Sequence, residues 1–146
     1  MSTIKKFEDL EIWQLARQLT NKIFALTEKG LFMKDFGFKD QIKRASGSVM
    51  DNIVEGFGRG GNREFVNLLS IAIASCNEVQ SQLYRARDWK YITVEEFEEC
   101  YKLTETIISK SGKFISYLNS SHHTGVKFKK QQTTNDKQQT KTYGTN

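Results

Sequence analysis

This chain has no proline and very little histidine. Its 146 residues include no proline, whereas average usage of about 5% would give roughly seven, so long uninterrupted helices are favoured over strands and turns. The two histidines, His122 and His123, follow the last predicted helix. Because the carboxylate di-iron bundles need Glu-x-x-His pairs on their helices, the sequence argues against a metal site, and we expect no cofactor.

Cysteine and long apolar runs are also scarce. Cys76 and Cys100 occupy apolar helical positions without a CxxC motif, so we interpret them as small core residues in a reducing compartment, with a disulfide between neighbouring helices as the alternative. No window approaches the 18 apolar residues of a membrane span, and the start MSTIKKFEDL lacks the apolar segment of a signal peptide. We therefore expect a soluble, cytoplasmic protein without membrane contacts.

The net charge of +5 is concentrated in the last part of the chain. Residues 122–146 contain five lysines and one aspartate, a net charge of +4. Residues 1–121 contain 17 basic and 16 acidic side chains, a net charge of +1. The overall charge therefore does not predict a basic folded surface.

The central stretch from Gln41 to Arg63 has two adjacent stripes at helical spacing. The apolar stripe consists of Ile42, Ala45, Val49, Ile53 and Phe57. The polar stripe consists of Gln41, Arg44, Ser48, Asn52, Glu55 and Arg59. Polar groups at the edge of a core need hydrogen-bond partners, and a partly polar row on the following helix offers them: Ile71, Ser75, Glu78, Gln82 and Arg85.

We interpret part of these two rows as a structural polar network, formed within one subunit or across a subunit boundary. Its members are Gln41, Ser48, Asn52, Glu55, Ser75 and Glu78. One alternative is that these residues contact a ligand or nucleic acid. The least favoured alternative is catalysis by two facing carboxylates, Glu55 and Glu78.

The apolar pattern of the second half predicts two sets of core positions. The first set is Phe65, Leu69, Ala72, Cys76, Val79, Leu83 and Ala86, and the second is Cys100, Leu103, Ile107, Ile108, Phe114, Ile115 and Leu118. Four long helices account for the whole pattern. We expect them at Glu8–Lys29, Phe38–Phe57, 62–90 and from Thr93 to Ser120, with a phenylalanine-rich loop from Leu31 to Phe38 folded over one end of the core. Asn62 is the predicted N-cap of the third helix, and Thr93 with Glu96 forms a capping box for the fourth. Residues 1–120 are thus predicted to be all-α, an antiparallel up-down-up-down four-helix bundle. Residues 121–146 are predicted to be a flexible polar and basic tail.

The glycine-rich corner at residues 56–63, GFGRGGNR, lacks the Lys-Ser/Thr ending and the preceding strand of an ATP-binding loop. We interpret it as a turn between helices, made possible by glycines that adopt positive φ. The alternative is that Arg59 and Arg63 contact RNA phosphates. The full candidate set for nucleic-acid binding is Arg44, Arg59, Arg63, Lys127, Lys129 and Lys130. Arg85, Arg87 and Lys90 suit the negative end of a helix dipole and could extend a basic edge.

Three motifs carry a resemblance to a known family: FEDLEIWQLA, FGFKDQIKRASGSVMDNIVEGFGRG and EFVNLLSIAIASCNEV. Over Phe7 to Leu118 the chain resembles the 23S rRNA intervening-sequence proteins, a ribosomal-protein-like family. The resemblance implies a left-handed antiparallel four-helix bundle, ring-shaped homopentamers, and bacterial genes within or outside intervening sequences of ribosomal RNA. A related branch, the accessory proteins of diversity-generating retroelements, implies a basic pentameric barrel that engages a reverse transcriptase and nucleic acid. The present chain differs in the near-neutral charge of residues 1–121 and in its tail.

These observations lead to two hypotheses. The first is a non-enzymatic, ribosome-associated bacterial protein that assembles with itself, as a homopentamer, and binds RNA or a ribonucleoprotein. The second is a protein-interaction scaffold without direct nucleic-acid binding. An enzyme is the least favoured class because the helices lack a nucleophile–base pair, and we expect no small-molecule substrate.

Overall fold

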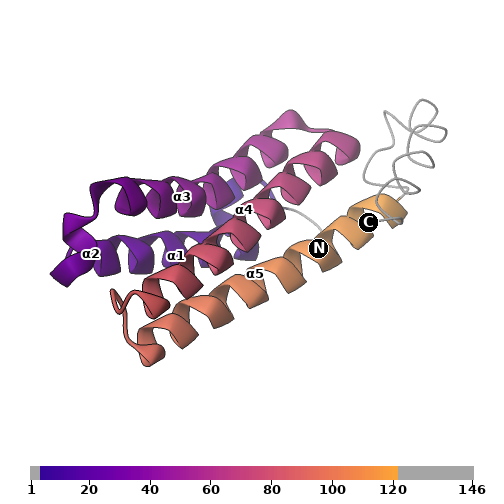
Figure 1. The fold of residues 1–146 in the computed structure, drawn as a ribbon. Coiled ribbons are helices and arrows are strands. Elements are labelled where there is room, and N and C mark those ends of the chain that lie inside the picture. The colour runs from indigo at the N-terminus through magenta and orange to yellow at the C-terminus, as the bar shows by residue number, and fades with distance from the viewer. Residues whose placement is uncertain (1–3, 122–146) are drawn as a thin grey trace.

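The described part of the chain is a bundle of antiparallel helices (Figure 1). The computed structural model describes residues 4–121, so the predicted tail at residues 121–146 lies outside it except for Ser121. The elements are η1 (Phe7–Asp9), α1 (Glu11–Thr27), α2 (Gly30–Lys34), α3 (Phe36–Arg59), α4 (Asn62–Asp88) and α5 (Val94–Ser120). Each long helix packs on the next, and α5 returns to α1. The predicted all-α, up-down-up-down arrangement is confirmed for these residues.

The core follows the predicted apolar stripes closely in α4 and less closely in α5. All seven predicted positions of α4, from Phe65 to Ala86, are buried, and burial of each large aliphatic side chain contributes about 1.5–3 kcal/mol. In α5 the polar Thr104 and Ser111 are fully buried. The predicted core residues Leu103, Ile108, Phe114 and Ile115 are half-buried at the edge of the core instead. Periodicity located the buried side of α5 but not its centre.

At one end of the bundle, which we call the glycine end, α3 and α4 are joined by a tight turn at Gly60, whose φ is +81°. The helix continues through Gly56 and Gly58, later than predicted. Gly56 serves close packing, because a Cβ there would lie 2.8 Å from the Phe65 ring. The prediction that Asn62 caps α4 is wrong: the cap position is Gly61. The Asn62 amide instead donates a hydrogen bond across to the Leu118 carbonyl, 3.2 Å away.

At the opposite end, the predicted loop from Leu31 to Phe38 is wrong, because a short helix, α2, forms there. Phe32 is buried and stacks on Phe38 with ring centroids 5.3 Å apart. The Asp35 carboxylate accepts a hydrogen bond from the Phe38 N–H at 3.2 Å, which starts α3 two residues earlier than expected. The apolar pattern here was too short to separate one helical turn from a loop.

The same end contains the turn between α4 and α5. The Lys90 N–H donates to the Arg87 carbonyl at 3.0 Å, and the Tyr91 N–H donates to the Ala86 carbonyl at 2.8 Å. This bonding pattern usually has glycine at its left-handed position, yet here that position is Lys90, with φ +63°. The predicted capping box of α5 is confirmed, with Thr93 and Glu96 exchanging hydrogen bonds of 2.9 and 3.0 Å.

Candidate functional site

A chain of hydrogen bonds connects the middle of α3 to α4. The Ser48 and Ser75 hydroxyls are 2.9 Å apart, and the Asn52 amide donates to the Ser48 carbonyl at 2.8 Å and to its hydroxyl at 2.9 Å. Ser75 is buried and the other two are half-buried. The structure therefore brings three residues of the predicted polar network together within one subunit.

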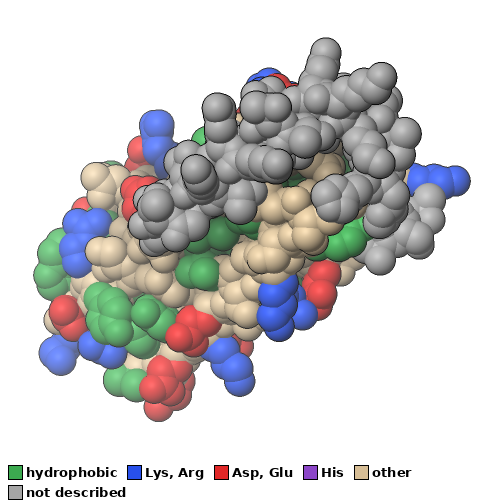
Figure 2. All heavy atoms as spheres, turned by 90° about the vertical axis from the view of Figure 1, so that its right-hand side faces the viewer, with side chains coloured by type: hydrophobic (Ala, Val, Ile, Leu, Met, Phe, Trp, Pro, Cys, Tyr) green, Lys and Arg blue, Asp and Glu red, His purple; other side chains and the backbone are tan. Residues whose placement is uncertain are grey.

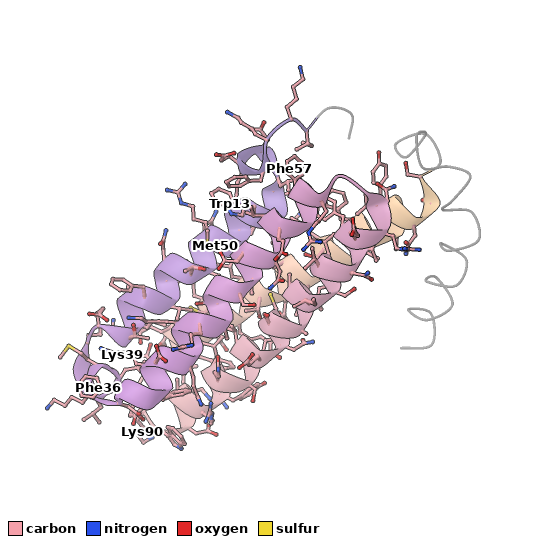
Figure 3. All side chains as sticks on the ribbon, turned by 90° about the horizontal axis from the view of Figure 1, so that it is seen from above. Trp13, Phe36, Lys39, Met50, Phe57 and Lys90 are labelled. Carbon is pink, nitrogen blue, oxygen red and sulfur yellow. The ribbon has the colours of Figure 1, made fainter. Side chains whose placement is uncertain are left out.

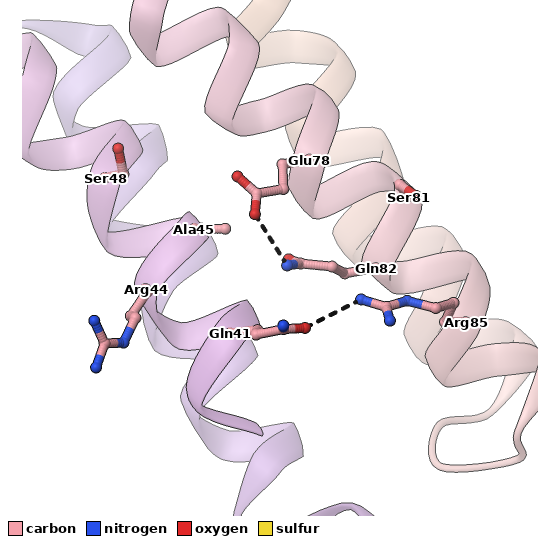
Figure 4. Close-up of a pocket in the computed structure, with 8 residues that line it drawn as sticks. All are labelled: Gln41, Arg44, Ala45, Ser48, Glu78, Ser81, Gln82 and Arg85. Atoms are coloured by element: carbon pink, nitrogen blue, oxygen red, sulfur yellow. Dashed lines mark hydrogen bonds between the residues drawn. The ribbon is translucent and has the colours of Figure 1, made fainter. Parts of the chain in front are cut away.

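Next to this chain, a groove of about 450 Å³ opens between α3 and α4 (Figure 4). It is lined by Gln41, Arg44, Ala45, Ser48, Glu78, Ser81, Gln82 and Arg85. Two long hydrogen bonds lie in it: Arg85 donates across the groove to the Gln41 Oε1 at 3.4 Å, and the Gln82 Nε2 donates along α4 to Glu78 at 3.5 Å. Small side chains on both helices leave the space open.

Gln82 is the least satisfied group of the groove. Its side chain is only 3% exposed, and its Oε1 has no hydrogen-bond partner among the described residues. An unpaired buried acceptor costs about 1–3 kcal/mol. The sequence pattern placed Gln82 on the row facing α3, but spacing alone carries no information about which acceptor lacks a partner. Ser81, which also lines the groove, was missed because it lies one residue off that row.

The remaining predicted network residue, Glu55, lies elsewhere and does not face Glu78. Its carboxylate accepts a hydrogen bond from Arg59 at 2.6 Å, and this bond raises the pKa of the arginine. Arg59 also lies 3.9 Å from Glu64. These contacts are solvent-exposed, and surface ion pairs contribute about 0–1 kcal/mol, so Arg59 can be released at small cost.

The other candidate phosphate contacts are dispersed. Arg44 points away from the groove (Figure 4) and forms an ion pair with Asp40 at 2.8 Å. Arg63 is half-buried at the start of α4, whereas Arg44 lies 15 residues before the end of α3. Lys127, Lys129 and Lys130 lie outside the described residues. Within residues 4–121, the predicted arginines are therefore spread along the bundle.

The two thiols are core groups, as predicted. Cys76 and Cys100 are free and buried, and burial raises the pKa of Cys76 to about 12 and that of Cys100 to about 11. Both therefore stay protonated at neutral pH and are weak nucleophiles. Within residues 4–121, no three His, Cys, Asp or Glu side chains are grouped as metal ligands, and no helix there is long and apolar enough to span a membrane.

The end of the bundle formed by α2, the start of α3 and the α4–α5 turn, here called the aromatic end, exposes two aromatic rings, and one of them, Phe36, was predicted to lie over the core. Phe36 is 74% exposed and Trp89 is 47% exposed. Phe32 and Phe38 do cover the core, but Phe36 points outward, which corrects the expectation for the third phenylalanine. Burying such a ring would contribute about 1.5–3 kcal/mol, so its exposure calls for a reason beyond folding.

Basic side chains are numerous at the aromatic end. Residues 29–44 and 84–91 contain eight basic and three acidic side chains. The start of α5 adjoins the same turn, and residues 94–99 contain four glutamates. Glu96 pairs with Lys29 at 2.7 Å, and Glu28 lies 3.8 Å from Lys39. Cations and carboxylates therefore lie side by side at this end, as they do on the visible part of the face in Figure 2.

Comparison with known proteins adds a family and a fold. A profile of the 23S rRNA-intervening sequence proteins matches residues 8–113. A crystal structure of a protein of unknown function from Bacteroides thetaiotaomicron, of the S23 ribosomal protein family, aligns with 23% sequence identity and a TM-score of 0.65. The alignment covers 71% of the present chain and 97% of that chain. A search of curated proteins gave no match.

The structural similarity supports the bundle fold, and the profile match spans most of the described helices. The chain belongs to the 23S rRNA-intervening sequence protein family.

Proposed function

We propose that this chain is a non-enzymatic protein that binds RNA or a ribonucleoprotein and assembles with copies of itself into a ring, as a homopentamer. The observation that carries the RNA-binding part is the combination, at the aromatic end, of the exposed rings of Phe36 and Trp89 with the eight Lys and Arg side chains of residues 29–44 and 84–91. Clustered Lys and Arg side chains release counterions from a nucleic-acid backbone, which is the main sequence-independent source of affinity.

Arg44, Arg59 and Arg63 contribute secondary phosphate contacts in this proposal. The guanidinium of Arg59 must leave Glu55, and that of Arg44 must leave Asp40. Because these are exposed i,i+4 pairs, each exchange costs about 0.5 kcal/mol or less. Lys127, Lys129 and Lys130 add charge from the tail.

Self-assembly is supported by the face that α3 and α4 present. The groove is lined by exposed polar side chains, Gln41, Glu78 and Arg85, whose hydrogen bonds are long. Ile71, which precedes Glu78 on the same row of α4, is exposed. A second subunit that pairs with these polar groups and covers Ile71 would bury both. The same observation favours the second candidate function, a scaffold that recruits another polypeptide through this face.

Salt dependence of RNA binding tests the proposal. The full chain and a chain ending at Ser121 are titrated into a fluorescent single-stranded RNA, and the dissociation constant is measured by anisotropy at several salt concentrations. We expect both to bind at low salt, with log K falling linearly with log salt at about 0.7 per neutralised phosphate. Substituting Arg59 and Arg63 together by alanine should lower that slope by roughly one.

Molar mass from light scattering, recorded with ultraviolet absorbance, tests assembly in the same samples. A pentamer with bound nucleic acid supports the full proposal. An assembly without RNA binding at any salt concentration supports the scaffold. A monomer that binds no RNA overturns both.

A further inference from the structure

We infer that the aromatic end binds single-stranded RNA, with Phe36 and Trp89 stacking on unpaired bases and Lys34 and Lys90 contacting the adjacent phosphates. The inference rests on the proposed RNA binding and names the surface and the class of RNA. Exposed aromatic rings combined with cations are the usual means of binding single strands without sequence preference.

Trp89 is held in place while half of it remains open to solvent. The edges of Phe38 and Tyr91 contact it at centroid distances of 5.4 and 5.9 Å, and the Arg85 guanidinium lies 5.6 Å from its centroid. Arg85 is itself fixed over the Phe38 ring at 4.5 Å. The indole is therefore pre-organised, so that stacking of a base would cost little side-chain entropy.

Phe36 differs from Trp89 because almost nothing packs on it. Lys39 places its ammonium 5.3 Å from the ring centroid, and most of the ring remains exposed. Figure 3 shows Phe36, Lys39 and Lys90 at the same end of the bundle. A ring flanked by lysines offers one surface to a base and a charge to the phosphate beside it.

Tyr91 lies between two hollows of this end. One, about 600 Å³, is lined by Leu31, Lys34, Asp35, Phe36, Gly37 and Tyr91. The other, about 550 Å³, shares Tyr91 and includes Lys29, Arg87, Lys90 and Val94. The Tyr91 hydroxyl donates to the Asp35 carboxylate at 2.8 Å, which fixes the ring between them. Each hollow has cations in its wall, Lys34 in the first and Lys29, Arg87 and Lys90 in the second, beside the carboxylates of Asp35 and Glu96. Two adjacent hollows with such walls suit successive nucleotides of one strand.

The geometry favours a single strand over a duplex. In an A-form duplex the faces of the bases are stacked and cannot contact a protein ring, whereas unpaired bases are free to stack on aromatic side chains. Cations alone would serve either form. The exposed rings are therefore the feature that distinguishes the two kinds of RNA.

Tryptophan fluorescence tests the inference directly, because the chain has two tryptophans and only one is at this end. A Trp13→Phe variant reports on Trp89 alone, and a Trp89→Phe variant reports on Trp13, which is half-buried beside Phe7. On addition of a 12-nucleotide oligouridine, we expect saturable quenching in the first variant and little change in the second. Binding seen by anisotropy without quenching of Trp89 would overturn the inference and leave the proposed function standing.

Alanine variants supply the affinity measurement. Phe36→Ala and Trp89→Ala should each weaken binding of oligouridine about tenfold, with little effect on duplex RNA. Trp13→Ala removes a half-buried ring that packs beside Phe7, away from the aromatic end (Figure 3), and serves as the matched control, expected to bind normally. Phe36 makes so few contacts that its removal should leave the helical circular dichroism unchanged. Equal losses for both forms of RNA would contradict stacking, and the absence of all RNA binding would overturn the proposed function as well.

Discussion

The two ends of the bundle solve the same problem with different residues. At the glycine end, the left-handed position of the turn is Gly60, and Gly56 allows α3 and α4 to approach closely. At the aromatic end, the start of α2 also has a left-handed glycine, Gly30, but the left-handed position of the α4–α5 turn is Lys90, and rings that could have been buried are exposed. A left-handed backbone conformation costs a non-glycine residue about 1–2 kcal/mol.

The difference indicates what each end is built for. The glycine end uses residues that favour a tight, stable connection, whereas the aromatic end retains a strained lysine and two exposed rings. Strain and exposure of this kind concentrate where a surface has a task besides folding. Substitutions that change the packing, the left-handed residues or the ion pairs of each end therefore test whether the two ends differ in this way.

The largest effect is expected at the glycine end, from Gly56→Ala. The new Cβ would lie 2.8 Å from the Phe65 ring and 3.1 Å from the Leu68 Cβ, so overpacking should lower the free energy of unfolding by about 1–3 kcal/mol. Gly58→Ala is the matched control, because no atom lies within 4 Å of its Cβ position and alanine favours a helix by about 1 kcal/mol. Urea denaturation measures both. Similar midpoints for the two variants would show that close packing at Gly56 is unimportant.

Intermediate effects of opposite sign are expected when the left-handed residues of the two turns, Gly60 and Lys90, are replaced. Gly60→Ala should destabilise by about 1 kcal/mol, and Lys90→Gly should stabilise by about 0.5–1 kcal/mol after the greater freedom of glycine in the unfolded chain is subtracted. Thermal unfolding measures both variants. Lys90→Gly should also weaken oligouridine binding, which would separate the role of this lysine from stability. A Lys90→Gly protein that is less stable than the parent would contradict the interpretation that the backbone of Lys90 is strained.

The smallest effect concerns two ion pairs made by α5, one with Lys29 at the aromatic end and one with Glu11 toward the other end. The hydrogen bond from Lys29, together with that from the Thr93 N–H, lowers the pKa of Glu96 below its ordinary value of 4.5. The charged carboxylate therefore stabilises the fold above about pH 4.5, and this contribution is lost as the pH falls through the lower folded-state pKa. Glu96→Gln should cost a few tenths of a kcal/mol at pH 7 and nothing at the acid limit.

Lys110→Ala is the corresponding change at the other end, where Lys110 lies 3.4 Å from Glu11. The Lys110–Glu11 distance is longer than the Lys29–Glu96 distance, and Glu11 is more exposed than Glu96. Removing Lys110 should therefore lower the free energy of unfolding by less, measured across pH. Equal losses at both ends, or a Glu96→Gln cost that persists in acid, would contradict this ordering.

The helical stripes made most of the fold predictable. Ile42, Ala45, Val49 and Ile53 recur at steps of three and four, and this spacing predicts the buried side because each helix buries one face. The capping box at Thr93 was predictable for the same reason, since it depends on four consecutive residues. The short helix α2 was not predictable, because its apolar pattern is too short to separate one helical turn from a loop. The role of Asn62 was not predictable either, because its side chain bonds Leu118, which is distant in sequence.

The candidate site was predictable only in part. The rows of α3 and α4 pointed to Ser48, Asn52 and Ser75, whose hydrogen bonds the structure brings together. The groove beside them depends on the side-chain volumes of two helices at once, which periodicity does not report. The aromatic end was missed because Phe36 and Trp89 are 53 residues apart in the sequence. They come to the same end of the bundle only when the antiparallel helices pack.

The antiparallel path of the chain places Ser120, the last residue of α5, at the opposite end of the bundle from Phe36 and Lys90. Rotational symmetry repeats this polarity in every copy. A closed ring of any number of subunits would therefore collect all its exposed rings along one circle and all its C-terminal helix ends along another. One molecule would then offer two separate, many-fold repeated surfaces, so that weak contacts of single subunits would add up to avid binding.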